Sequence, residues 1–110
     1  MGQSIGEFEQ LILLALVRLE ADAHGVAIRR EIESRTGRTV SAGALYTALD
    51  RLEARGFIAS RLGEPTPERG GKRKRLYAVR PAGRQALARS MDALRKMAAG
   101  VTSKVLAFRT

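Results

Sequence analysis

The chain has 110 residues, 45% of them hydrophobic, with a formal net charge of +9 and a sequence pI of about 11.2. This length suits a single domain with a real core, and the apolar share excludes a disordered chain. So large a positive charge favours a polyanionic partner, either nucleic acid or an anionic membrane surface. The chain has no cysteine, which excludes disulfides, a thiolate nucleophile and a cysteine-based zinc site.

The positive charge is concentrated in the second two-thirds of the sequence. Residues 1–33 carry three basic and six acidic side chains, so the remainder carries +12. The apolar run at residues 11–17 is too short for a transmembrane helix, which needs ~20 residues, and it lacks the features of a signal peptide. We therefore expect a soluble protein of the cytoplasm, associated with the nucleoid, and no membrane partner.

Apolar residues recur at helical spacing near the start of the chain and predict a first helix. They are Phe8, Leu11, Ile12, Ala15, Leu16 and Leu19. Leu13, Leu14 and Val17 extend the apolar surface beyond one face, so more than one side of this helix must be covered. Either it is a central core helix, or its second face meets another subunit.

Two shorter helices are expected next. One runs from about residue 26 to 35, with Gly37 as the residue that ends it. The next begins with Ser41 as its N-cap and ends at Arg55, before Gly56. Its two faces differ, because one is apolar and the other has short or polar side chains. The apolar face holds Leu45, Ala48, Leu49 and Leu52, and the opposite face holds Gly43, Thr47, Asp50 and Ala54.

A basic β-hairpin and a last helix complete the pattern. Residues 57–62 and 73–79 have strand patterns, and the segment 63–68 is a turn-rich tip. Pro81 suits the first position of a helix, and residues 101–110 either continue this helix or fray. The last helix has an apolar stripe made of Leu87, Met91, Leu94 and Met97. This order of elements predicts a fold that is mainly α with a small β-hairpin, a winged helix-turn-helix with one added C-terminal helix.

Several stretches of the sequence together match one family. They are residues 6–9 with the leucine-rich run after them, His24–Ile28, Ser41–Glu53, Gly56–Ile58, Arg69–Tyr77 and Pro81–Arg84. With these residues the chain resembles the PadR family of bacterial transcriptional regulators over about residues 6–98, in the branch with a single short C-terminal helix. The most specific part is the run Gly-Ala-Leu-Tyr-x-x-Leu-x-Arg-Leu-Glu, which starts at Gly43. His24 and Arg80 depart from the family, which usually has Tyr and Thr at these positions.

The resemblance implies a dimeric repressor that occludes a promoter at an inverted-repeat operator. The third helix would enter the major groove, the wing would reach towards the minor groove, and the first and last helices would pair the subunits. The expected division is a winged helix-turn-helix DNA-binding domain at residues 1–80 and a dimerisation helix and tail at residues 81–110. The expected dimer contacts are Leu13, Leu14, Val17, Leu87, Met91, Leu94 and Met97.

The expected DNA contacts lie on the third helix and on the basic segment at residues 69–75. Short side chains let the helix N-terminus approach DNA, while Tyr46 and Arg51 flank the groove-facing side. Three of these residues also have a purely structural interpretation. Ser41 can serve only as the N-cap, Tyr46 can pack on the wing, and Arg51 can pair with an acid. A basic run is often only a solvated face, but this one lies between two strands. The expected contacts are Ser41, Gly43, Tyr46, Thr47, Arg51, Arg69, Lys72, Arg73, Lys74 and Arg75.

Other classes of function have weaker support in the sequence. An RNA- or ribosome-associated protein would use aromatic stacking, and the chain has five aromatic residues, most at core-like positions. A winged-helix protein-interaction module does not need so highly charged a wing. No paired acid and base or nucleophile pattern points to catalysis, so we expect no enzyme activity, cofactor or metal, and His24 suits packing or capping. The sequence leaves open whether a small-molecule inducer binds, because an apolar dimer interface has the same sequence pattern with or without a pocket.

Overall fold

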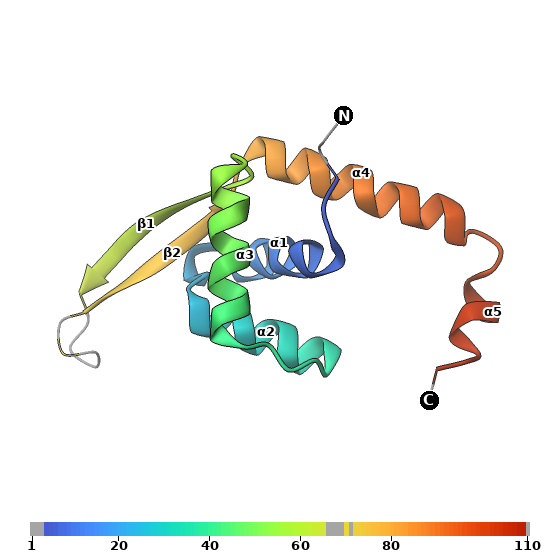
Figure 1. Ribbon diagram of the computed structural model, residues 1–110, viewed down its shortest axis with the longest axis horizontal. Helices are drawn as coiled ribbons and strands as arrows, with labels where there is room; N and C mark the ends of the chain where they lie inside the picture. The colour runs from blue at the N-terminus through green and yellow to red at the C-terminus, as the bar shows by residue number, and fades with distance from the viewer. Residues whose placement is uncertain (1–3, 66–69, 71, 110) are drawn as a thin grey trace.

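The computed structural model describes residues 4–65, 70 and 72–109, and Figure 1 shows their arrangement. The elements are α1 (Glu7–Leu19), a 3-10 turn η1 (Glu20–Asp22), α2 (Gly25–Thr36), α3 (Ala42–Ala54), β1 (Ile58–Pro65), β2 (Arg73–Val79), α4 (Pro81–Ala98) and α5 (Thr102–Leu106). The expected winged-helix fold, mainly α with a small hairpin, is confirmed. Within the described part of the chain, no helix has the length and apolar character to cross a membrane.

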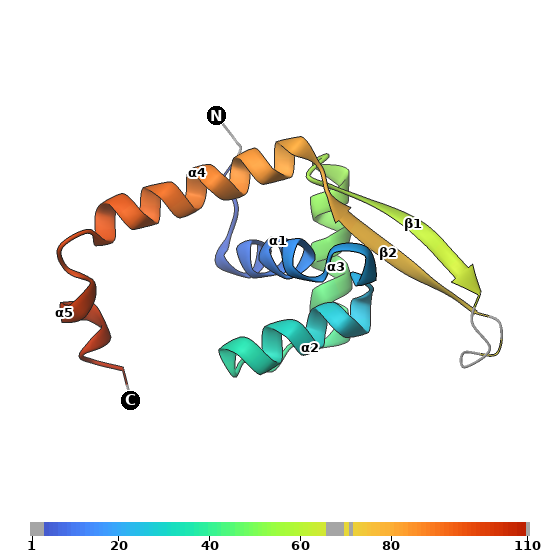
Figure 2. The ribbon, with the colours of Figure 1, turned by 180° about the vertical axis from the view of Figure 1, so that it is seen from behind.

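Helix α1 lies at the centre of the fold, in contact with α2, α3, α4 and β2 (Figure 1 and Figure 2). Its buried residues are Ile12, Leu13, Ala15 and Leu16. Because neighbours cover it on several sides, the apolar run is wider than the stripe of an ordinary surface helix. Leu13 is fully buried in the core of the single chain and offers no surface to a second subunit. In the single chain Leu13 therefore packs within the core, and so does Leu87, another of the expected dimer contacts.

The bounds of α2 and α3 follow from local chemistry at their ends. Gly37 has a φ of 74°, the left-handed conformation that ends α2 and that favours glycine. The Ser41 hydroxyl accepts a hydrogen bond from the Ala44 N–H at 3.1 Å, which confirms it as the N-cap of α3. Leu45, Ala48, Leu49 and Leu52 are buried, as the spacing predicts.

The hairpin pairs β1 with β2 in antiparallel register, with Ser60 opposite Tyr77. The expected end of β1 at residue 62 was wrong, because residues 63–65 extend the strand rather than belonging to the turn. A register shift between Leu62 and Pro65 accommodates the extra residues, and a proline is tolerated at such an irregularity. A bridge from His24 to Leu76 adds a short contact on the other edge of β2.

Helix α4 is anchored to the body only by its first turns. The Arg80 N–H donates to the Phe57 carbonyl at 2.9 Å, and Pro81 occupies the first turn as expected. Gly83, Ala86 and Leu87 are buried, so the core crosses residue 80, the expected boundary between two parts of the chain. Beyond them α4 extends away from the other helices (Figure 1). The tail forms the separate helix α5 after a break at Gly100, whose φ is 82°.

Candidate nucleic-acid interface

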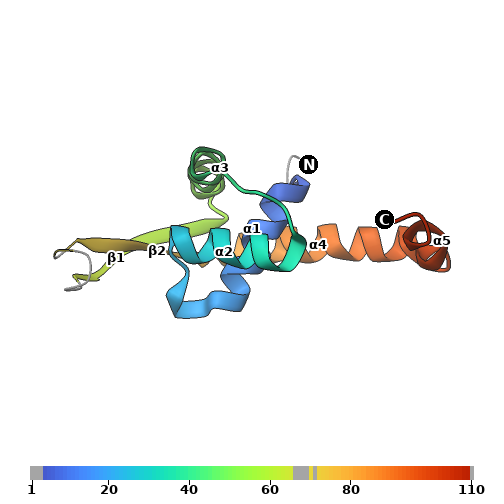
Figure 3. The ribbon, with the colours of Figure 1, turned by 90° about the horizontal axis from the view of Figure 1, so that it is seen from below.

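The exposed face of α3 is the first part of the candidate site. Seen from below, α3 is nearly end-on and stands out on one side of the other elements (Figure 3). A Cβ built on Gly43 would have no neighbouring atom within 4 Å, so this position is open. Thr47 and Asp50 are exposed on the same face, opposite the buried leucines. Short side chains on an unobstructed helix face allow the close approach of another molecule.

Tyr46 lies beside this face, where its position depends on a glycine of another helix. The side chain is 44% exposed. A Cβ built on Gly25 would overlap the Tyr46 hydroxyl and lie 2.7 Å from its Cζ. The absence of a side chain at Gly25 therefore makes room for the phenol at the start of α2. The sequence did not predict this contact, because the two residues are far apart in the chain.

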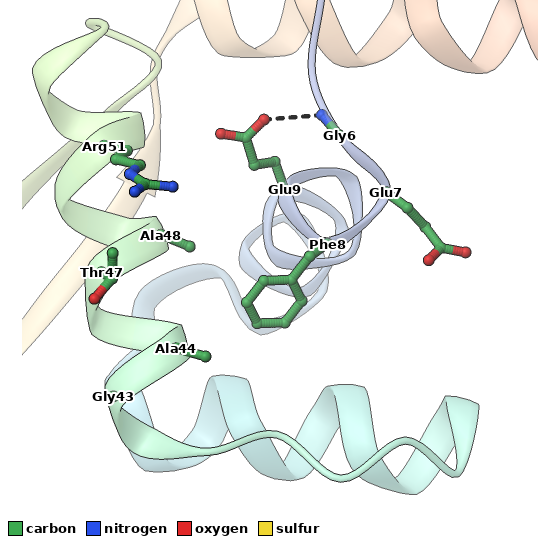
Figure 4. A pocket seen from close by; sticks show the side chains of 9 residues that line it. All are labelled: Gly6, Glu7, Phe8, Glu9, Gly43, Ala44, Thr47, Ala48 and Arg51. Carbon is green, nitrogen blue, oxygen red and sulfur yellow. Dashed lines mark hydrogen bonds between the residues drawn. The ribbon is translucent and has the colours of Figure 1, made fainter.

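A cleft of about 550 Å³ separates α3 from the start of α1. Figure 4 shows its walls, with Arg51 directed from α3 towards the α1 side. Among the described residues Arg51 has no ion-pair partner, so the alternative of pairing with an acid is not observed. Its guanidinium is thus available at the edge of the α3 face. The lining residues are Gly6, Glu7, Phe8, Glu9, Gly43, Ala44, Thr47, Ala48 and Arg51.

Two acidic residues at the start of α1 form ion pairs with two other arginines near α3. Glu7 pairs with Arg38 at 2.8 Å, and Glu9 pairs with Arg55 at 3.4 Å. Glu9 also accepts a hydrogen bond from the Gly6 N–H at 2.8 Å, which fixes its carboxylate at the helix N-terminus. Because Arg38 and Arg55 already have acidic partners, their charges contribute less to the field around α3 than that of Arg51.

The hairpin supplies the basic part of the site, projecting from the body beside α3 (Figure 1). Lys72, Arg73 and Arg75 are exposed, and Lys74 is half-buried. Because side chains alternate along a strand, Arg73 and Arg75 share the face of Tyr77. Arg75 donates a hydrogen bond to the Ser60 hydroxyl at 3.2 Å, so it already has a partner within the hairpin. The expected contact Arg69 lies outside the described residues.

Tyr77 connects the base of the hairpin to the body. Its N–H donates to the Ala23 carbonyl at 2.9 Å, and its side chain is buried in the core. Burial is the main cause that raises the pKa of the Tyr77 phenol above its ordinary value, and the nearby Tyr46 raises it further. The phenol therefore stays neutral at physiological pH, as a buried hydroxyl requires.

A helical core, an exposed helix with short side chains and a basic hairpin beside it define the winged-helix class of transcriptional regulators. The comparison with known families gives the particular family. The chain belongs to the transcriptional regulator PadR-like family, whose model matches residues 13–89. The resemblance inferred from the sequence is thereby confirmed, and the protein is a transcriptional regulator.

Two relatives and two solved structures illustrate the similarity. The chain is 39% identical to the transcriptional regulator Rv3488 of Mycobacterium tuberculosis over 77 residues, covering 70% of this chain and 67% of that protein. It is 36% identical over 93 residues to an uncharacterised 37.1 kDa protein in transposon TN4556 of Streptomyces fradiae, covering 84% of this chain and only 24% of that protein.

The solved structures share the fold at lower identity. A PadR family transcription regulator from Clostridium difficile R20291 has a TM-score of 0.74 and 21% identity, with 91% of this chain and 99% of that chain covered. Bacillus subtilis PadR in complex with operator DNA has a TM-score of 0.65 and 22% identity, with 76% of this chain and 47% of that chain covered.

Proposed function

We propose that this PadR-like regulator is a repressor that binds double-stranded DNA as a homodimer and blocks a promoter. The observation that carries the proposal is the open face of α3 beside a basic hairpin. A helix presented in this way fits the major groove, which is about 12 Å wide. The net charge of +9 favours the same partner. The complex of Bacillus subtilis PadR with operator DNA, a protein of the same fold, adds support.

The face of α3 is proposed to select the sequence. Gly43 and Thr47 bring the helix close to the base edges, where a threonine hydroxyl or methyl makes contacts. Asp50, which is not among the contacts expected from the sequence, lies on this face. A carboxylate accepts a hydrogen bond from the cytosine amino group. Tyr46 and Arg51 flank the face and are assigned to phosphates, as is the N-terminal turn at Ser41.

The hairpin is proposed to supply affinity and register through the DNA backbone. Phosphate contacts carry no sequence information but fix how a protein sits on the duplex. Lys72, Arg73 and Lys74 are the described residues assigned to this role, and Arg69 is assigned to it from its place in the sequence.

The outer part of α4 is proposed to form the dimer contact. Leu94 is 61% and Met97 is 82% exposed in the single chain, and Met91 is also exposed. Val17 on α1 is exposed and Leu14 is half-buried, and both are proposed to belong to the dimer contact as well. Exposed apolar groups that form a contiguous patch mark an interaction surface. A second copy covers these side chains and creates the two-fold axis that an inverted repeat requires.

A gel-shift experiment tests the proposal directly. The probe is the DNA just upstream of the protein's own gene, with an excess of random DNA or of RNA as competitor. We expect retardation that survives both competitors, because base contacts add to the non-specific electrostatic attraction. Retardation that either competitor abolishes at equal excess would contradict sequence-specific repression, and RNA as the stronger competitor would favour RNA association instead.

A further inference from the structure

A chain of hydrogen bonds joins α3 to both strands of the hairpin. The Ser60 hydroxyl lies 3.1 Å from Oε1 and 2.9 Å from Oε2 of Glu53, and the Arg75 Nη1 lies 3.2 Å from the same hydroxyl. A hydroxyl has one proton to donate and lone pairs that accept. Since a carboxylate only accepts and a guanidinium only donates, Ser60 donates to Glu53 and accepts from Arg75. The direction of every hydrogen bond in this cluster is thus fixed.

The three residues come from three different elements. Glu53 lies in the last turn of α3, Ser60 lies in β1, and Arg75 lies in β2 on the same face as Tyr77. The cluster also marks the point at which the hairpin leaves the body. Ile58 and Tyr77 at its base are buried, whereas Leu62, Lys72 and Arg73 further from the body are exposed. A bond made at this point controls how the exposed part of the hairpin is directed.

We propose that the Glu53–Ser60–Arg75 cluster sets the angle between the hairpin and α3, and that Arg75 is a positioning residue rather than a phosphate contact. The proposal rests on the proposed DNA binding by α3 and the hairpin. It changes the role expected for Arg75 from the sequence. The hydrogen bond from Arg75 Nη1 to the Ser60 hydroxyl holds the guanidinium at the base of the hairpin.

The cluster also explains how an acid is tolerated beside a surface that faces DNA. The Glu53 carboxylate lies one turn of helix from Asp50, and both add negative charge where phosphates approach. The guanidinium of Arg75 brings a compensating positive charge to the same place through the shared hydroxyl. The charge of Arg75 is therefore used within the protein, whereas Lys72 and Arg73 have no ion-pair partner among the described residues.

The salt dependence of DNA binding distinguishes a phosphate contact from a positioning residue. Each phosphate contact adds about 0.9 to the slope of log K against log salt. The probe is a 30-base-pair duplex of fixed random sequence, and the variants are Lys72→Gln, Arg75→Gln, Ser60→Ala and Ser60→Thr. Lys72→Gln is the matched control for a lost phosphate contact, and Ser60→Thr is the conservative variant that keeps the hydroxyl.

We expect Lys72→Gln to lower the slope by about 0.9. Arg75→Gln and Ser60→Ala should keep the slope of the natural protein and weaken binding about two- to tenfold, the range set by the net contribution of one hydrogen bond. Ser60→Thr should restore the affinity. A slope that falls in Arg75→Gln as it does in Lys72→Gln would overturn the proposal, and so would Ser60→Ala binding as tightly as the natural protein.

A second measurement separates this proposal from the proposed function. Urea unfolding of Glu53→Gln, Arg75→Gln and the double variant requires no DNA. If the cluster acts as a unit, the double variant loses less stability than the two single variants together. Additive losses of stability would contradict the proposal that the three residues act as a unit. If the natural protein binds no duplex while the losses are non-additive, DNA binding fails and the cluster stands as a link between α3 and the hairpin.

Discussion

Two glycines are enclosed by neighbours that leave no room for a side chain. At Gly25 the neighbour is the phenol of Tyr46, and at Gly83 it is the backbone of Phe57, whose carbonyl carbon would lie 3.0 Å from a Cβ. These contacts join α2 to α3 and α4 to the start of β1. The first places a side chain of the candidate site, and the second fixes the direction in which α4 leaves the body.

The variant Gly25→Ala tests the contact with Tyr46. The added methyl overlaps the phenol, and such overpacking costs about 1–3 kcal/mol. We expect the free energy of unfolding to fall by this amount in urea titrations at equal protein concentration. Gly43→Ala is the matched control, because its Cβ meets nothing within 4 Å and alanine favours a helix. Equal effects of the two substitutions would contradict the contact.

The raised pKa of Tyr77 predicts a loss of stability in alkali. Above about pH 10 the phenol of the unfolded chain ionises, while burial keeps the folded Tyr77 protonated. The unfolded state therefore binds fewer protons, so the free energy of unfolding falls as the pH rises towards the folded pKa. Urea titrations between about pH 9 and 11.5 should show a smaller decline in Tyr77→Phe than in the natural protein. Parallel declines would show that Tyr77 does not contribute.

At the scale of single elements, local chemistry predicted the helices better than the hairpin. Ser41 and Gly37 act within a few residues of their own position, so the ends of α2 and α3 were predicted to within a residue. The end of β1 depends on its partner strand and on the register shift before Pro65, which the sequence does not specify locally. For the same reason the sequence predicted the charge of Arg75 but not its hydrogen bond to Ser60.

At α1 the spacing of apolar residues predicted the helix but not which of its side chains are buried. It predicted a helix covered on more than one side, yet it did not separate side chains that face the core from those that face outwards. Leu13 is fully buried and Val17 is 39% exposed, although both widen the same apolar run. Which of them is buried depends on the positions of α2, α3 and α4 around α1.

The double variant Lys72→Ala and Arg73→Ala tests the hairpin as an element. Two lost phosphate contacts should lower the slope of log K against log salt by about 1.8. Both residues are exposed, so the urea midpoint should stay close to that of the natural protein. An unchanged salt slope would remove the hairpin from the proposed contact surface.

At the scale of the whole molecule, the central feature is an arm made of α4 and α5, which extends away from the other elements (Figure 1). The described residues span 52 × 35 × 22 Å, and α4 with α5 extends to the side away from the hairpin (Figure 1). The apolar side chains in the outer part of this arm, such as Leu94, Met97 and Phe108, face solvent in the single chain. A second copy that covers them would hold two α3 helices at a fixed separation.

The variant Leu94→Glu tests the proposed dimer. A charge buried in an apolar contact without a partner is strongly unfavourable. We therefore expect sedimentation to show a dimer for the natural protein and a monomer for Leu94→Glu. Gln85→Glu is the control, because it adds the same charge at an exposed position of the same helix. If Leu94→Glu remains a dimer, the dimer contact does not include the outer part of α4.

The central claim is that two α3 helices select an inverted repeat, and enrichment of binding sequences from random duplexes tests it most directly. We predict enriched duplexes with two inverted half-sites whose centres are about 10 base pairs apart, or a multiple of one helical turn. Substitution of Thr47 by Ala should alter the preferred bases within each half-site. A library that stays random after repeated selection, or a single half-site bound by a monomer, would contradict the claim.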